Sequence, residues 1–259
     1  MLTFVGLGLY DERSITVAGR DAIRDADRVV GEFYTSKLAG STVADLEAYH
    51  GVDVEVRDRA GVERDPDDVL DDARSQDVVF LTAGDTMVST THVDLRLRAH
   101  ERDVETRIVH GTTAQTAASS LTGLQNYRFG KATTLPFERS HGGEGVPASV
   151  VETIEANRER GLHTLVFLDI DAANDDYMRA NVAAGALAEA WSADGLGVAV
   201  ARAGSPSPVV RADDLETLAG ESFGDPLHLL VVPGDLHLLE REALAELGDA
   251  PENALPPAV

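Results

Sequence analysis

The 259-residue sequence contains no cysteine, which excludes disulfide bonds, a thiol nucleophile and every metal site that needs thiolate ligands. It also lacks an apolar run of roughly 18 residues, which excludes a helical membrane span. It begins on a strand-like segment without the basic start of an export signal, so we expect a cytoplasmic protein without a membrane partner. The length predicts one large or two small domains that need no covalent cross-links.

Lysine is almost absent, with only Lys37 and Lys131 in the whole chain. The 22 basic residues stand against 45 acidic ones, for a net charge of −23. A field of this sign repels a phosphate backbone and argues against nucleic acid as a partner. The acidic residues are spread along the chain, and at about 1 M salt a Debye length near 3 Å screens their mutual repulsion. We therefore expect a halophilic protein whose stability rises with salt.

Three catalytic patterns are also missing. The eight histidines form neither His-x-His nor His-Glu-x-x-His, so we expect no metal site. No Gly-x-Ser-x-Gly segment is present, which disfavours a serine hydrolase. Asp11 stands where a dinucleotide fingerprint that starts at Gly6 and Gly8 requires its third glycine, which disfavours a nicotinamide-dependent oxidoreductase.

Short apolar runs alternate with helical periodicity in the first hundred residues, as in a parallel sheet built from βαβ units. The expected strands there are 2–5, 28–30, 52–56, 78–81 and 104–109, and the expected helices are 15–26 and about 89–99. In the second half we expect strands at 131–135, 164–168, 197–201, 209–210 and 228–232, and helices at 148–160, 177–190 and 239–247. The connection 204–208 is too short for a helical crossover, so the strands that it joins are expected to be antiparallel.

We therefore predict an α/β protein with two domains. The first, residues 1–112, has a parallel sheet, and the second, residues 113–259, is a mixed-sheet α/β domain whose tail frays from about residue 251. The segment 138–146 contains three glycines and is expected to be a mobile loop.

Three turns that follow strands of the first domain are candidates for ligand binding, because open α/β sheets bind ligands beyond the carboxyl ends of their strands. Glycines in Val5 to Leu9 allow a ligand to approach the backbone, and Asp85 offers an acceptor for a ribose hydroxyl or an amino group. The segment His110 to Ala114 opens a helix whose N–H groups suit a carboxylate. Each turn also has a purely structural interpretation, with Asp85 as a helix cap, and His228 is equally compatible with a hydrogen-bonded core histidine.

Seven segments occur in an order and at spacings typical of one family. They are Val5 to Leu9, Gly31 to Ser36, Gly84 to His92, Tyr127 to Lys131, Phe167 to Ile170, Ala201 to Ser205 and His228 to His237. Over nearly its whole length the sequence resembles the archaeal-type diphthine synthases, which are tetrapyrrole methylase-like methyltransferases. The Glu32 to Ser36 and Val232 to His237 segments are specific to that branch. The resemblance implies a two-domain tetrapyrrole methylase-like fold.

The resemblance implies an enzyme that transfers methyl groups from S-adenosyl-L-methionine, with S-adenosylhomocysteine as the product. The acceptor is the amino group of a modified histidine on translation elongation factor 2, a step of diphthamide biosynthesis. The resemblance also implies a homodimer. Two alternatives stay open: a precorrin-type tetrapyrrole methyltransferase, and a non-catalytic nucleotide-binding α/β module.

The same resemblance, carried over position by position, assigns cofactor contacts to eight residues. They are Leu9, Asp85, Val88, Thr113, Ala114, Leu168, Ala203 and His228. The sequence departs from the family pattern at Thr86, where proline is common, at Thr113 and Ala114, and in the segment 138–146.

Methyl transfer from a sulfonium requires alignment of donor and acceptor more than an acid–base pair. We therefore assign no catalytic residue. Glu32, Tyr34, Asp169 and water are alternative acceptors for the proton of the substrate amine.

Overall fold

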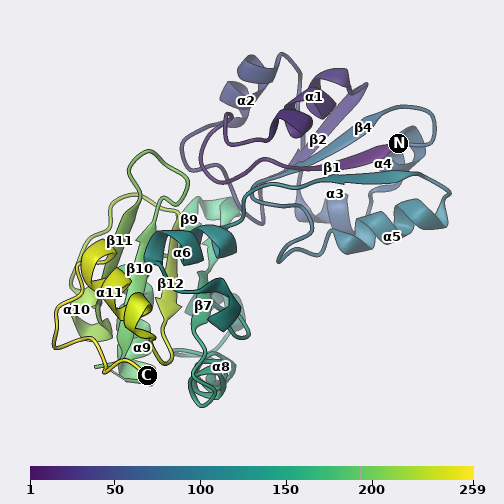
Figure 1. Ribbon diagram of the computed structural model, residues 1–259. Coiled ribbons are helices and arrows are strands. Elements are labelled where there is room, and N and C mark those ends of the chain that lie inside the picture. The colour runs from purple at the N-terminus through teal and green to yellow at the C-terminus, as the bar shows by residue number, and fades with distance from the viewer. Residues whose placement is uncertain (193) are drawn as a thin grey trace. The chain divides into compact units, whose positions relative to one another are not determined.

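The computed structural model describes residues 1–192 and 194–259, which divide into two compact units. Unit 1 comprises Met1–Thr113 with Ala172–Asn174, and unit 2 comprises Ala114–Asp171 with Asp175–Val259. Each unit contains a five-stranded sheet with helices packed on both faces, so the predicted α/β class is confirmed (Figure 1). Among the described residues, no helix has both the length and the apolar character needed to cross a membrane.

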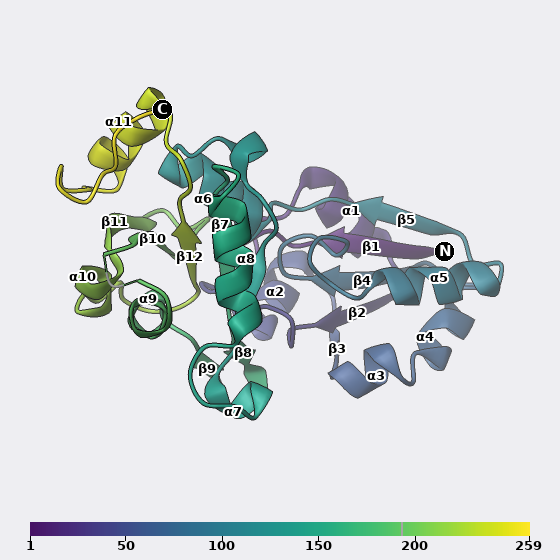
Figure 2. The same cartoon turned by 90° about the horizontal axis from the view of Figure 1, so that it is seen from below.

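The sheet of unit 1 is entirely parallel, as predicted. Its strand order is β3-β2-β4-β1-β5, and Figure 2 shows β5, β1, β4 and β2 in this sequence. The strands are β1 (Leu2–Gly6), β2 (Arg28–Glu32), β3 (Glu55–Arg57), β4 (Val78–Thr82) and β5 (Thr106–Val109). The helices are α1 (Val17–Asp25), α2 (Val43–His50), α3 (Arg59–Glu63), α4 (Asp67–Asp72) and α5 (Val93–Glu101).

Alternate side chains of the buried strands serve opposite faces of this sheet. Phe4 and Phe80 lie in the apolar cluster that includes residues of α3, α4 and α5, whereas Val5 and Leu81 pack with residues of α1 and α2. The helix that follows β1, α1, therefore packs on one face of the sheet, and the helix that follows β4, α5, packs on the other. Because β1 and β4 are neighbours, their carboxyl ends form a topological switch point, the position at which open α/β sheets bind ligands.

The main sheet of unit 2 is mixed, as predicted, with the order β11-β10-β12-β7-β6. Only β6 and β7 are parallel, and the expected antiparallel pairing near residues 200 and 210 is confirmed by the register Val200 opposite Val210. The strands are β6 (Thr133–Leu135), β7 (Thr164–Leu168), β10 (Leu196–Ala201), β11 (Val209–Asp214) and β12 (His228–Val232), with a small hairpin of β8 (Ile170–Asp171) and β9 (Asp176–Tyr177).

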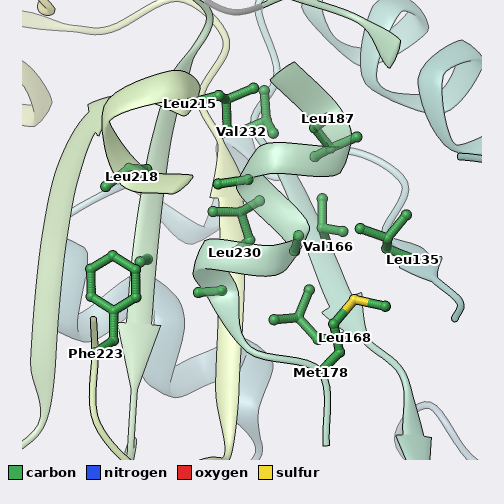
Figure 3. Packing of buried hydrophobic residues seen from close by; sticks show 14 of the residues in the cluster. Leu135, Val166, Leu168, Met178, Leu187, Leu215, Leu218, Phe223, Leu230 and Val232 are labelled. Atoms are coloured by element: carbon green, nitrogen blue, oxygen red, sulfur yellow. The ribbon is translucent and has the colours of Figure 1, made fainter. Parts of the chain in front are cut away.

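Helices cover both faces of the unit 2 sheet. They are α6 (Ala114–Thr122), α7 (Glu138–His141), α8 (Ala148–Arg158), α9 (Ala180–Ala190), α10 (Leu215–Ala219) and α11 (Leu238–Leu247), with a short 3-10 turn at Asn126–Arg128. A second 3-10 turn, Ala172–Asn174, belongs to unit 1. On one face, Val166 and Leu230 of the strands pack against Leu187 of α9 and Leu218 of α10 (Figure 3). On the other face, Val198 and Val231 pack with residues of α6 and α11. The sheet is therefore buried on both sides.

Several predicted boundaries differ from the structure for local reasons. The helix expected from about residue 89 begins at Val93, because Ser89 has a φ of 58° and cannot belong to a right-handed helix. The helix expected from residue 177 begins at Ala180, because Tyr177 pairs with Ile170 in the small hairpin. The segment 138–146, expected to be a loop, starts with the single helical turn of α7, which ends at Gly142 in the left-handed conformation.

The terminal segment from residue 251, expected to fray, packs against unit 2 instead. Leu255 is 6% exposed and belongs to the apolar cluster formed with α6 and α11. The N–H of Val259 donates to the carbonyl oxygen of Leu236 at 2.9 Å, and Arg241 donates to the carbonyl oxygen of Pro256 at 3.2 Å. The proline-rich composition predicted a frayed tail, and the burial of Leu255 is what orders it.

Candidate functional site

The turns after β1 and β4 are joined through their glycines. The N–H of Gly84 donates to the carbonyl oxygen of Gly8 at 2.6 Å, and the N–H of Gly8 donates back to the carbonyl oxygen of Gly84 at 3.2 Å. Both residues have positive φ angles, 79° for Gly8 and 75° for Gly84, which L-amino acids with a side chain rarely adopt. The two turns are thus held together at the switch point.

A third turn packs directly onto these two. A Cβ atom on Gly111, which follows β5, would lie 2.1 Å from the carbonyl oxygen of Gly84. A Cβ atom on Gly6 would lie 2.5 Å from the same oxygen and 2.6 Å from the nitrogen of Gly111. By contrast, apart from Gly84 itself and its two chain neighbours, no atom of the described residues lies within 4 Å of the Cβ position of Gly84. The three turns therefore meet backbone to backbone on one side, while the backbone of Gly84 has open space on the other.

Asp85 links the turn after β4 to the turn after β5. Its side chain is 3% exposed, and its Oδ1 accepts from the N–H of Met87 at 2.9 Å. Its Oδ2 accepts from the N–H of Gly111 at 3.2 Å and lies 2.8 Å from Nδ1 of the exposed His110 ring. Because α5 begins only at Val93, Asp85 does not cap that helix. The structural alternative considered for Asp85 is therefore wrong in detail, since the residue bridges two turns instead.

The other assigned residues of unit 1 lie on the same three turns. Leu9 is half-buried and directly follows Gly8, Val88 is 39% exposed, and Thr113 is half-buried at the end of the third turn. The structure thus brings Leu9, Asp85, Val88 and Thr113 to the carboxyl edge of one sheet, although they are distant in sequence.

The assigned residues of unit 2 also gather, apart from Ala114. Leu168 ends β7, His228 begins the antiparallel strand β12, and Ala203 follows the end of β10, whose Ala201 pairs with His228. These three residues therefore share one edge of the second sheet. Ala114 is the first residue of α6, which packs on a face of that sheet.

The imidazole of His228 is fully engaged inside unit 2. Its Nδ1 accepts from the N–H of Ala180 at 3.1 Å, and its Nε2 lies 2.9 Å from the carbonyl oxygen of Asp225, which can only accept. His228 is 5% exposed, and burial lowers the pKa of its ring below the usual range. The side chain is therefore a neutral core histidine, so a ligand contact of His228 would have to come from its backbone.

The three side chains considered as proton acceptors have different environments. Glu32 is 0% exposed, so it has no contact with solvent or with an incoming amine. Tyr34 is half-buried, and burial followed by the charges of Glu32 and Glu63 raises the pKa of its hydroxyl. Asp169 accepts from the N–H of Phe137 at 2.8 Å and from its neighbour Ile170 at 2.9 Å. The burial of Glu32 argues against it as a general base.

The sequence analysis missed two buried histidine–glutamate pairs. In the unit 1 pair, Nε2 of His92 lies 3.4 Å from Oε1 of Glu32, and in the unit 2 pair, Nε2 of His163 lies 3.0 Å from Oε1 of Glu240. All four side chains are 0% exposed. Glu32 and His92 lie in two of the segments that carry the family resemblance, and Glu240 follows a third by three residues. That resemblance was the one signal in the sequence that pointed to these residues. Contacts between residues so far apart in the chain could not be read from spacing.

Comparisons with known proteins agree on one family. The family model of tetrapyrrole (corrin/porphyrin) methylases matches residues 1–219. A curated diphthine synthase of Natronomonas pharaonis is 66% identical over 268 aligned residues, with 100% of each chain covered. A curated diphthine synthase of Methanosarcina mazei is 50% identical, with 98% of each chain covered. A solved crystal structure of a diphthine synthase is similar with a TM-score of 0.91 at 42% identity, over 98% of each chain.

Proposed function

Since the chain belongs to the tetrapyrrole methylases and, within them, to the diphthine synthase family, we propose that it methylates a modified histidine of translation elongation factor 2. The methyl donor is S-adenosyl-L-methionine, and the acceptor is the amino group of that histidine. The observation that carries this function is the full-length identity of 66% with a curated diphthine synthase. The same relatives favour a protein substrate over a precorrin and favour an enzyme over a non-catalytic nucleotide-binding module.

The edge of unit 1 has features that suit such a cofactor. The open space beside Gly84 allows a ligand to reach the backbone without meeting a side chain. Leu9 and Val88 supply apolar surface, Asp85 supplies a carboxylate, and Thr113 precedes the first helical residue of α6. We assign the unit 1 contacts to these four residues, and the unit 2 contacts to Ala114, Leu168, Ala203 and the backbone of His228.

When bound, S-adenosyl-L-methionine supplies a methyl group on a positively charged sulfur that is a good leaving group. The residues of the chain bind and orient the donor and the acceptor amine and exclude water from the reacting atoms. The amine must lose its proton before the reaction, because a protonated amine has no lone pair to attack the methyl carbon. No side chain is assigned the role of base, since alignment supplies the main acceleration.

Two measurements test this function. Calorimetry in about 3 M KCl should detect binding of S-adenosyl-L-methionine, with the surface repulsion screened. Incubation with elongation factor 2 that carries the unmethylated modified histidine should then yield the methylated factor and S-adenosylhomocysteine. Binding without any methylated product would support the non-catalytic module, and methylation of a precorrin instead of the factor would support the tetrapyrrole alternative.

Replacement of Asp85 by alanine tests the cofactor assignment. We expect binding of S-adenosyl-L-methionine to weaken by about 1–3 kcal/mol, as for the loss of a buried hydrogen bond to an ionised group. Asp94→Ala, at an exposed position of α5, serves as the matched control. An unchanged affinity in Asp85→Ala would reduce Asp85 to a link between two turns.

We also propose that the protein acts as a homodimer in the cytoplasm, as the family resemblance implies. Sedimentation in about 3 M KCl, where charge repulsion is screened, tests the oligomeric state. A single monomeric species at micromolar concentration would contradict the dimer.

A further inference from the structure

The unit 1 pair lies beneath the turn that carries Asp85. Glu32 ends β2 and His92 immediately precedes α5. Nδ1 of His92 lies 3.1 Å from the carbonyl oxygen of Thr86, and Nε2 lies 3.4 Å from Oε1 of Glu32. A carbonyl oxygen can only accept, so Nδ1 must carry a hydrogen and donate it to Thr86.

This arrangement leaves Nε2 with a specific problem. A neutral imidazole carries one hydrogen, and here that hydrogen is on Nδ1. The Nε2 of a neutral His92 would then carry a lone pair 3.4 Å from a carboxylate oxygen, which is also an acceptor, and Nε2 has no hydrogen-bond partner. Two acceptors that face each other in a fully buried site, one of them without any hydrogen-bond donor, are unfavourable. One more proton, on Nε2 or on Oε1, converts the contact into a favourable one.

We propose that Glu32 and His92 share one buried proton and that this proton makes them positioning residues for the cofactor site. The cofactor part of this proposal rests on the function proposed above. The shared proton joins the segment after β2 to the turn after β4.

The contacts on each side of the pair explain how it would position the turns. Oε2 of Glu32 accepts from the N–H groups of Tyr34 and Thr35, both at 3.1 Å, and Oε1 accepts from the hydroxyl of Thr35. On the other side, His92 holds the carbonyl of Thr86, the residue next to Asp85. A proton between the two side chains therefore fixes both segments relative to the sheet of unit 1.

Other charged groups near the pair act in opposite directions. The pKa of His92 is lowered overall, because burial outweighs the raising effects of the charge of Glu32, the Thr86 carbonyl and the charge of Glu63 on α3. Glu63 is itself held by the hydroxyl of Thr91, at 3.1 Å. The further titratable groups on this side, which act on the half-buried Tyr34, are Asp58 and Arg59. Because the two side chains interact closely, the proton belongs to the pair rather than to either residue.

The unit 2 pair provides an internal control. There, Nδ1 of His163 accepts from the N–H of Gly234 at 3.0 Å, so the single hydrogen of the neutral ring is on Nε2. That hydrogen points at Oε1 of Glu240, 3.0 Å away. No additional proton is needed, and the two pairs should give different spectra in one sample.

Nuclear magnetic resonance of the unliganded wild-type protein tests the shared proton directly. With ¹⁵N-histidine and ¹³C-glutamate labels at pH 7 and high KCl, His163 should show the neutral form protonated on Nε2. The unit 1 pair should show either a doubly protonated His92 ring or a protonated Glu32 carboxyl group. A neutral His92 protonated on Nδ1 beside an ionised Glu32 would overturn the proposal. Signals are assigned with His92→Gln and His163→Gln.

Two variants test the positioning role. In Glu32→Gln the amide group donates permanently to Nε2 of His92, so the affinity for S-adenosyl-L-methionine should stay within about threefold of the wild type. Glu32→Ala removes the link, and the dissociation constant should rise about tenfold or more, with a smaller change in kcat. Unchanged affinity in Glu32→Ala would overturn the positioning role.

The pH profile separates a shared proton from a merely structural contact. As the pH rises, wild-type affinity should fall when the pair loses its proton, whereas Glu32→Gln should bind equally well throughout. Identical profiles would contradict a positioning role for the proton.

Failure of the wild type to bind S-adenosyl-L-methionine would reject the proposed function while leaving the spectroscopic test of the pair intact. The proton and the cofactor are thus judged by separate measurements.

Discussion

The unit 1 pair and the unit 2 pair contain the same two residue types, and all four side chains are 0% exposed. They differ in the backbone group that meets the far nitrogen of the histidine. Nδ1 of His92 faces the carbonyl of Thr86, whereas Nδ1 of His163 accepts from the N–H of Gly234. The proposed difference in proton content therefore follows from the backbone group at Nδ1. A second difference is the guanidinium of Arg128, whose Nη1 lies 3.5 Å from Oε2 of Glu240.

The two pairs also differ in how completely they are satisfied. Glu240 accepts from the N–H groups of Gln125 and His237, both at 2.9 Å, as well as from His163. The unit 2 pair therefore joins three segments of unit 2, as a structural element does. Beside it, Nη1 of Arg128, 3.5 Å from Oε2 of Glu240, is buried without a hydrogen bond. Around the unit 1 pair, three such atoms are found: Nε2 of His92 and the hydroxyls of Tyr34 and Thr86. A concentration of unsatisfied polar groups is typical of functional regions.

Breaking the unit 2 pair should have the largest effect on stability. In Glu240→Gln an amide N–H₂ replaces one of two oxygens that both accept from N–H groups, so donor meets donor. We expect a loss of about 3–5 kcal/mol in the free energy of unfolding, measured with urea at constant KCl. Glu242→Gln, at an exposed position of the same helix, is the control. Equal stability of the two variants would remove the structural role assigned to Glu240.

Acidification should reveal the neutral histidine of the unit 2 pair. Burial lowers the pKa of His163, so the unfolded chain binds a proton below about pH 6.5 that the folded protein does not. The contribution of His163 to stability should therefore be constant at higher pH and fall as the pH drops through this value, by up to about 1.4 kcal/mol per pH unit for each such histidine. Urea unfolding between pH 7.5 and pH 5.5 measures this slope. Stability that rises on acidification would contradict the assignment.

The contribution of surface ion pairs to stability should depend on salt, whereas the contribution of the two buried pairs should not. Arg28 contacts Glu55 at 2.7 Å, Asp68 at 2.8 Å and Asp72 at 2.7 Å, and these carboxylates are largely exposed. Arg28→Gln should lower stability by about 1 kcal/mol at low salt and by much less in about 3 M KCl, whereas the effect of Glu240→Gln should persist. Thermal unfolding in graded KCl measures both variants, with the exposed Arg74→Gln as control. The wild type, with its net charge of −23, should melt at a higher temperature as KCl increases.

The smallest effect on the free energy of unfolding should come from Glu32→Gln, the counterpart in unit 1 of Glu240→Gln. In Glu32→Gln, the single amide oxygen can still accept from the N–H groups of Tyr34 and Thr35. The N–H₂ group can donate to Nε2 of His92 and to the hydroxyl oxygen of Thr35. We expect the free energy of unfolding to change by less than about 1 kcal/mol, since every polar group that contacts residue 32 keeps a partner. A loss as large as that of Glu240→Gln would show that the two pairs do not differ in proton content.

Much of the fold could be predicted because its signals are local. The strands β1, β4, β7 and β12 are short apolar runs, and the connection 204–208 was too short for anything but an antiparallel return. The start of α5 could not be predicted, because the left-handed conformation of Ser89 depends on the packing of the turn around it. The order of the tail likewise depends on one buried side chain, Leu255, whose partners lie elsewhere in unit 2.

The candidate site was predictable to a similar degree. The glycine turns and Asp85 were found because ligands bind at the carboxyl ends of parallel strands. The partners of Asp85 and the two histidine–glutamate pairs were not found, because they depend on contacts between residues that are remote in sequence. His228 shows the limit of a motif. It was selected by resemblance, yet both of its ring nitrogens are engaged within the core.

At the contact among Gly6, Gly84 and Gly111, no side chain of the described residues lies between the three turns. Where side chains separate two loops, a change of rotamer can absorb a substitution or a small shift, but here one carbonyl oxygen is approached from two directions by bare backbone. A displacement of any of the three turns must therefore carry the other two with it. Substitution of the residues that flank these glycines can therefore change which ligand the edge binds, while the backbone positions of the three turns stay the same.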